Sequence, residues 1–231
     1  MRSIHDNLQA VRERVARAAQ AAGRAPESVV LLAVSKTHPA ARVRAVLDAG
    51  QRMLGENYVQ EAVEKMDALA EEGAPRPEWH LIGPLQSNKT RVVAERFDWV
   101  QSVESEKVAR RLSGQRSGNL PPLNVLLQVN VSGEASKSGA APADVPALAE
   151  AVSRLPRLRL RGLMAIPEPG APRERYRELR ALFEGLRTAH RWDTLSVGMS
   201  DDLETAIAEG STMVRIGTAI FGAREVPRAA A

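Results

Sequence analysis

The chain has 231 residues, a formal net charge of +4 and no cysteine. This length suffices to bury a sizeable core, and no linker or low-complexity segment divides the chain, so we interpret residues 1–231 as one domain. Without cysteine, disulfides, thiolate metal sites and a cysteine nucleophile are excluded, which fits a reducing compartment. The four histidines show no ligand spacing, so the sequence predicts no metal site.

The basic residues do not form a patch typical of nucleic-acid binding. Arginines predominate, and they are interleaved with acidic residues along the whole chain, as in RERYRELR at 173–180. Aromatic residues that could stack on bases make up only 3%. The N-terminus lacks the apolar core of a secretory signal, and no apolar run approaches the roughly 18 residues of a membrane span. We therefore expect a cytoplasmic protein with neither nucleic acid nor membrane as a partner.

The first predicted element is an amphipathic helix over residues 3–22, which Gly23 ends. Apolar, strand-forming runs then alternate with helical stretches, a pattern that indicates parallel βαβ units. The predicted strands are 29–35, 51–54, 79–82, 98–103, 123–131, 158–166, 194–198 and 212–217. The predicted helices between them are 40–49, 57–72, 88–96, 105–112, 143–154, 172–190 and 201–209. Helix ends are indicated by Gly50, Gly73 and Gly210, and N-caps by Ser87 and Asp201.

Eight such strand–helix units in a chain of this size predict an α/β fold, a single (β/α)8 TIM barrel with an extra N-terminal helix. The alternative is a doubly wound open sheet, which often carries a glycine-rich nucleotide loop. No GxGxxG or GxxxxGK[ST] motif occurs, so the barrel is favoured. In such barrels the functional residues gather at the carboxyl ends of the strands.

Lys36 stands at one of these ends, directly after the largely apolar run VVLLAVS. A lysine held where a buried strand opens into a loop can lose solvation, which lowers its pKa and exposes a nucleophilic amine. A salt bridge at the strand end would also place a lysine here. The position alone leaves both interpretations open.

The last two predicted strands end in SVGMSDD and VRIGTAIFG, where barrels often bind phosphate. Gly198 and Gly217 would let the backbone approach an anion closely, and Ser200 and Thr218 would add hydroxyl donors. Each motif alone is more often a turn or a helix cap, but together they predict a phosphate site. A lysine facing a phosphate clamp is what a Schiff base with a phosphorylated aldehyde requires.

Several segments resemble the pyridoxal phosphate homeostasis protein family, and the resemblance runs from about residue 5 to residue 224. The segments include LLAVSKTHPA, LGENYVQE, EWHLIGPLQSNKT, LRLRGLMAIP and LSVGMSDDLETAIAEGSTMVRIGTAIFGAR. The resemblance implies a fold type III barrel, similar to the alanine racemase N-terminal domain, that binds pyridoxal 5′-phosphate (PLP). The sequence departs from the family at His38, where a second lysine is expected, and at GEAS before Lys137.

The resemblance also implies roles for individual residues. It makes Lys36 the lysine of a PLP aldimine, and it makes Ser200, Gly217 and Thr218 the residues that hold the phosphate. Arg215 would face the pyridine nitrogen. Asn57, His80 and Met164 would line the pocket.

An arginine opposite the pyridine nitrogen would weaken PLP as an electron sink, because arginine can only donate a hydrogen bond. We also expect no second domain to supply an opposing base. The leading hypothesis is a PLP carrier or regulator without catalytic residues, which exchanges PLP with apo PLP-dependent enzymes and is a monomer or a weak dimer. The alternatives are a slow PLP-dependent amino-acid racemase and a Schiff-base aldolase for a phosphorylated sugar.

Overall fold

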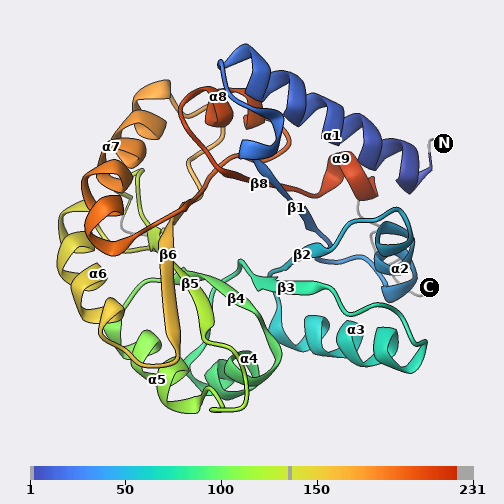
Figure 1. Cartoon of the computed structure of the whole chain (residues 1–231), viewed down its shortest axis with the longest axis horizontal. Helices are drawn as coiled ribbons and strands as arrows, with labels where there is room; N and C mark the ends of the chain where they lie inside the picture. The colour runs from blue at the N-terminus through green and yellow to red at the C-terminus, as the bar shows by residue number, and fades with distance from the viewer. Residues whose placement is uncertain (1–2, 135–136, 223–231) are drawn as a thin grey trace, which may run out of the picture.

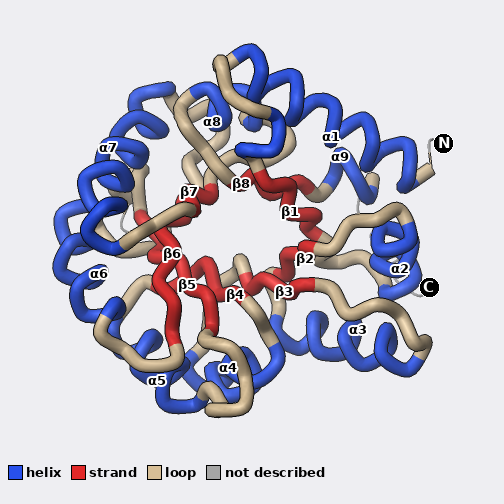
Figure 2. Tube along the Cα trace, in the orientation of Figure 1, coloured by secondary structure: helices blue, strands red, loops and turns tan. Residues whose placement is uncertain are grey.

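The computed structural model describes residues 3–134 and 137–222. Within them eight parallel strands close into a barrel, and helices surround it (Figure 1, Figure 2). The strands are β1 (Val30–Val34), β2 (Met53–Glu56), β3 (Glu78–Leu81), β4 (Trp99–Val103), β5 (Leu123–Val129), β6 (Leu158–Ala165), β7 (Thr194–Ser196) and β8 (Met213–Ile216). Each strand pairs with its neighbours in the sequence, and β8 pairs with β1. The predicted (β/α)8 barrel is confirmed, and the doubly wound open sheet is excluded.

The helices follow the strands in strict alternation. They are α1 (Ile4–Ala21), α2 (Ala40–Asp48), α3 (Val59–Glu71), α4 (Thr90–Arg96), α5 (Glu106–Gln115), α6 (Val145–Ser153), α7 (Arg173–His190), α8 (Leu203–Ala208) and α9 (Thr218–Phe221). Short 3₁₀ turns lie at Pro26–Ser28, Ser87–Lys89 and Pro142–Asp144. None of the helices in the described part of the chain is long and apolar enough to span a membrane.

The extra N-terminal helix is confirmed as α1. It begins with a capping box, in which the Ser3 hydroxyl accepts from the Asp6 backbone and the Asp6 carboxylate accepts from the Ser3 backbone. Its buried residues Leu8, Val11 and Val15 recur at helical spacing on one face. This face packs on α8 and α9, so α1 covers the side of the barrel where the chain closes (Figure 1).

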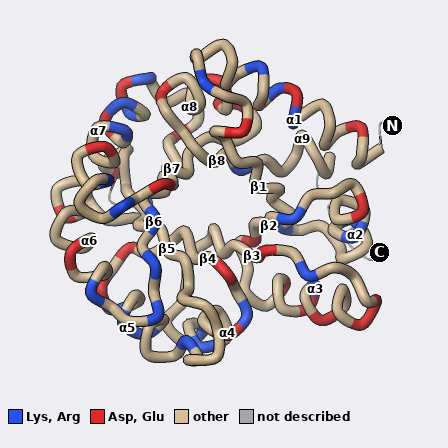
Figure 3. Tube along the Cα trace, viewed as in Figure 1, with Lys and Arg blue, Asp and Glu red and all other residues tan. Residues whose placement is uncertain are grey.

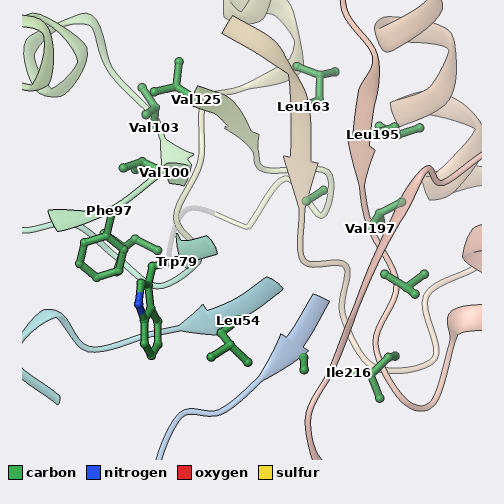
Figure 4. Packing of buried hydrophobic residues seen from close by; sticks show 14 of the residues in the cluster. Leu54, Trp79, Phe97, Val100, Val103, Val125, Leu163, Leu195, Val197 and Ile216 are labelled. Carbon is green, nitrogen blue, oxygen red and sulfur yellow. The ribbon is translucent and has the colours of Figure 1, made fainter. Parts of the chain in front are cut away.

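Alternate residues of each strand point to opposite sides of the barrel wall. Outward-facing residues such as Leu54, Val125 and Leu163 pack against the helices in the main core (Figure 4). Inside the barrel lie smaller apolar clusters, one of which contains Leu32 and Ile82. Charged residues lie mainly on the surrounding helices and loops (Figure 3). A wall buried on both faces explains why the strands read as nearly continuous apolar runs.

The second strand differs from the prediction of 51–54. It runs from Met53 to Glu56, paired with β3. Gln51 is buried before the strand, and its side-chain amide donates to the carbonyls of Leu31 and Met53, at 2.9 Å each. Gly55 lies within this strand, and the position favours glycine because a Cβ there would come within 3.1 Å of the Leu32 side chain.

Both predicted N-caps are wrong. Ser87 begins a 3₁₀ turn, and α4 begins three residues later, at Thr90. Asp201 lies before the cap position of α8, which is Asp202. The Asp202 Oδ1 instead accepts from the Met199 N–H, 2.6 Å away, and so shapes the preceding loop. The helix α9 was not predicted, because four residues are too few to show a helical period.

Candidate cofactor site

A cavity of about 260 Å³ opens at the carboxyl ends of the strands. Six of the eight residues singled out from the sequence line it, and they come from the ends of β1, β2, β7 and β8. These six are Lys36, Asn57, Ser200, Arg215, Gly217 and Thr218. Apolar side chains, among them Val34, Ile82 and Met199, form the rest of the wall. Topology therefore joins residues that are up to 182 positions apart, from Lys36 to Thr218.

His80 and Met164, the other two residues singled out from the sequence, are not among the residues that line this cavity. Both are fully buried inside the barrel. The His80 ring stacks on Trp99, and Met164 packs in the same small cluster as Trp99. Two residues further along the same faces of β3 and β6, Ile82 and Ile166 line the cavity instead. The two-residue period of a strand is the signal that would have identified these two isoleucines.

Two glycines shape the backbone at the end of the cavity formed by β7 and β8. Gly198 has a φ of +106°, and a Cβ there would lie 2.6 Å from the Ala206 Cβ, so only glycine fits. A Cβ at Gly217 would lie 3.2 Å from the Val34 carbonyl oxygen. The Arg215 N–H donates to the Gly198 carbonyl at 2.9 Å and ties the two strand ends together.

The loop that carries Ser200 is held from outside the barrel. The Arg14 guanidinium of α1 donates to the Ser200 carbonyl oxygen at 2.8 Å. The Tyr176 hydroxyl donates to Asp202 Oδ2 at 2.6 Å. Burial, together with the Asp202 carboxylate, raises the pKa of Tyr176, so this hydroxyl remains a donor. The extra helix thus fixes one wall of the cavity.

Arg215 places a buried cation against the cavity. Its Nη1 donates to the carbonyl and to the hydroxyl of Ser196, both at 2.8 Å, and its Nη2 donates to the Ala165 carbonyl at 2.8 Å. Burial lowers the pKa of Arg215 to about 10, so the side chain is still charged at neutral pH. Within the described residues, no carboxylate forms an ion pair with it.

A chain of buried hydrogen bonds continues from Arg215 through the barrel interior. The Ser196 hydroxyl donates to Gln101 Oε1 at 2.7 Å. Gln101 Nε2 lies 3.0 Å from His80 Nδ1, and His80 Nε2 lies 2.9 Å from Glu78 Oε1. Because the amide nitrogen can only donate, we assign the His80 proton to Nε2, which donates to Glu78. Burial lowers the pKa of His80, so the ring is neutral.

A second cavity, of about 290 Å³, adjoins the first and shares the walls formed by Asn57, Ile82 and Ile166. Lys137 lines it. The Lys137 Nζ donates to the Ser132 hydroxyl at 3.0 Å and lies 2.8 Å from Glu134 Oε1. The barrel mouth therefore has two adjoining compartments.

Comparison with known proteins identifies the family. The sequence-family model of the alanine racemase N-terminal domain matches residues 7–225 of this chain. The pyridoxal phosphate homeostasis protein of Pseudomonas aeruginosa is 61% identical over 229 residues, which cover 97% of this chain and 97% of that protein. The chain belongs to the pyridoxal phosphate homeostasis protein family. The resemblance inferred from the sequence motifs is thereby confirmed.

Two further comparisons cover members of the pyridoxal phosphate homeostasis protein family. The Escherichia coli K12 protein is 56% identical over 97% of this chain and 98% of its own length. The solved structure of PipY from Synechococcus elongatus, with PLP bound, has a TM-score of 0.83 and 37% identity. The match covers 95% of this chain and 100% of PipY.

Proposed function

We propose that this protein binds PLP in the cavity at the barrel mouth, with Lys36 as the covalent anchor, and acts in PLP homeostasis as a carrier with little or no turnover. The observation that carries the proposal is the convergence of Lys36, Arg215 and the loops bearing Ser200 and Thr218 on one cavity. The PLP bound to the related PipY supports it. The absence of cysteine supports a cytoplasmic location.

The residues of the cavity fit PLP. The aldehyde that PLP supplies reacts with amines, and Lys36 offers one. Arg215 is a donor-only cation, which suits the ring nitrogen as an acceptor. Asn57 Oδ1 is buried and has no hydrogen-bond partner among the described residues, so it can accept from a hydroxyl on the cofactor ring. Ser200 and Thr218 hydroxyls and the backbone at Gly217 suit the phosphate.

The same residues favour a carrier over a racemase. Among the described residues that line the cavity, the titratable ones are Lys36, Asp201 and Arg215. Arg215 cannot accept a proton, and it leaves the ring nitrogen unprotonated, which makes PLP a weak electron sink. Asp201 is exposed to solvent. A racemase needs a positioned base on each face of the substrate, and among the described residues that line this cavity only Lys36 meets that requirement.

Exchange of the α-proton of amino acids distinguishes the two functions. We expect the PLP-loaded protein to exchange the α-protons of alanine and of a panel of other amino acids in deuterated water no faster than free PLP does. The measurement is the loss of the α-proton signal by NMR, with free PLP at the same concentration as control. Exchange at about 1–10³ s⁻¹, the ordinary range of enzymes, would reject the carrier and establish the racemase.

Ser200→Ala tests the phosphate site. We expect the substitution to weaken PLP binding by about ten- to a hundredfold, because it removes one hydrogen bond to a charged group. Binding of pyridoxal, which lacks the phosphate, should be the same in the variant and the wild type. Ser153→Ala, at an exposed serine on α6, is the control. If Ser200→Ala weakened the binding of PLP and of pyridoxal equally, the phosphate would bind elsewhere.

We further propose that PLP passes from this protein to apo forms of PLP-dependent enzymes. The second compartment beside the cavity supports this, because an incoming amine could approach the cofactor from there while the phosphate is still held.

We expect the carrier to be a monomer or a weak dimer, which sedimentation of the loaded protein would measure.

A further inference from the structure

A buried cluster of charged residues lies beside the turn that carries Lys36. Glu56 at the end of β2 is fully buried, and Lys65 of α3 is 5% exposed. Lysine is rarely buried unless its charge is paired, because removing an ammonium group from water is costly. Lys65 therefore differs from a lysine such as Lys107, which is exposed on α5.

Lys65 makes the full number of hydrogen bonds that an ammonium group can donate. Its Nζ lies 2.7 Å from the Ser35 carbonyl oxygen, 2.7 Å from Glu56 Oε1 and 2.6 Å from Glu61 Oε1. Three donors thus meet three acceptors. One of the three acceptors belongs to the backbone of the residue that precedes Lys36.

The two carboxylates of the cluster also hold this turn directly. Glu56 Oε1 accepts from the Ser35 hydroxyl at 2.6 Å. Glu61 Oε1 accepts from the backbone N–H of Thr37 at 2.5 Å. The cluster therefore forms hydrogen bonds to the residue before Lys36 and to the residue after it.

The turn is held in a conformation that it would not adopt readily by itself. Thr37 has a φ of +65°, in the left-handed region that β-branched residues avoid. Such a conformation persists where the surroundings determine it, and the bond from the Thr37 N–H to Glu61 is one of these determinants. The residue that follows Lys36 is thus kept strained by the cluster.

We propose that Glu56, Glu61 and Lys65 are positioning residues for Lys36, which fix the direction in which its side chain leaves the strand. The inference rests on the proposed function of Lys36. A cluster serving stability alone would gain as much from apolar packing, because buried ion pairs often contribute no more than well-packed hydrophobic residues. Here the charges are directed at the two peptide groups that flank one lysine.

The test separates positioning from binding with two ligands. Lys36 and the PLP aldehyde form a C=N bond and release water, and borohydride reduces that bond to a stable amine. Pyridoxine 5′-phosphate carries the same ring and phosphate with an alcohol in place of the aldehyde, so it binds without forming this bond. The rate of the covalent step is followed by visible absorbance and by borohydride trapping, and the binding of pyridoxine 5′-phosphate by calorimetry.

We expect Lys65→Met and Glu61→Ala each to slow the covalent step by about ten- to a hundredfold, the effect of misplacing a reacting group by about 1 Å. The affinity for pyridoxine 5′-phosphate should stay within about threefold of the wild type. Glu61→Gln keeps an acceptor for the Thr37 N–H and should restore most of the rate. Lys107→Met is the control. If Lys65→Met does not fold, Glu61→Ala decides, because Glu61 is 27% exposed and lies at the edge of the cluster.

The positioning role would be overturned if the variants left the covalent rate unchanged. It would also be overturned if they lowered the affinity for pyridoxine 5′-phosphate as much as they lowered the covalent rate. A wild-type protein whose borohydride adduct does not map to Lys36 would instead overturn the proposed function, and this inference with it. The two failures are distinguishable, because the second is seen in the wild type.

Discussion

Lys36→Ala is expected to abolish both the visible absorption band of the PLP-loaded protein and the adduct that borohydride fixes. Among the described lysines, Lys36 lines the same cavity as the loops proposed to hold the phosphate. Lys65 already donates to three acceptors, and Lys137 belongs to the neighbouring compartment, where it donates to Ser132. Absorption spectra and peptide mapping of the reduced protein measure the outcome.

The variant should still bind pyridoxine 5′-phosphate, because the proposed phosphate site does not include the Lys36 side chain. Lys107→Ala, on the exposed face of α5, is the matched control and should keep the band. Mapping of the wild-type adduct to Lys89 or Lys137 would refute the assignment. A wild-type protein that forms a borohydride adduct with a phosphorylated sugar but shows no visible band with PLP would favour the aldolase.

Arg215→Met is expected to lower the free energy of unfolding by about 2–4 kcal/mol. Arg215 donates to the carbonyl oxygens of Ser196 and Ala165, and the loss of each of these buried hydrogen bonds costs about 1–3 kcal/mol. The loss of the buried charge itself offsets part of this cost. Urea unfolding of the ligand-free protein, followed by circular dichroism, measures the change.

Arg44→Met is the matched control for this experiment. Arg44 lies at the surface, with ion pairs to Asp48 and Glu72. Such exposed pairs contribute little, so this variant should stay within about 0.5 kcal/mol of the wild type. Equal stabilities of the two variants would show that the barrel interior does not need the guanidinium.

The fold was predictable because a parallel barrel gives a simple pattern. Its strands are buried on both faces and read as apolar runs, and its helices show an amphipathic period. The second strand was displaced in the prediction because Glu56 ends it, and a carboxylate is unexpected in a buried strand. The charge is tolerated because Lys65, nine positions later, pairs with it. Such a pairing is a property of the tertiary structure.

The site was predictable to the extent that it follows from strand ends. Lys36, Ser200 and Thr218 follow β1, β7 and β8, and the topology of a barrel brings these ends together. His80 and Met164 lie deeper in the barrel, and their depth depends on how each strand is staggered against its neighbours. The partners of Arg215 were equally inaccessible to sequence reasoning, because they are set by side-chain contacts across the barrel.

The hydrogen-bonded chain from Glu78 to Arg215 has a fixed donor order, since the carboxylate at one end can only accept and the guanidinium at the other can only donate. Turning over the Gln101 amide would place its oxygen against the unprotonated His80 Nδ1, so that two acceptors would face each other and the sequence of hydrogen bonds would break. Arg215, the member of this chain that lines the cavity, is therefore preorganised and needs no rearrangement when a cofactor arrives or leaves. In a PLP carrier, the residence time of the cofactor would then be governed by the reversible bond to Lys36.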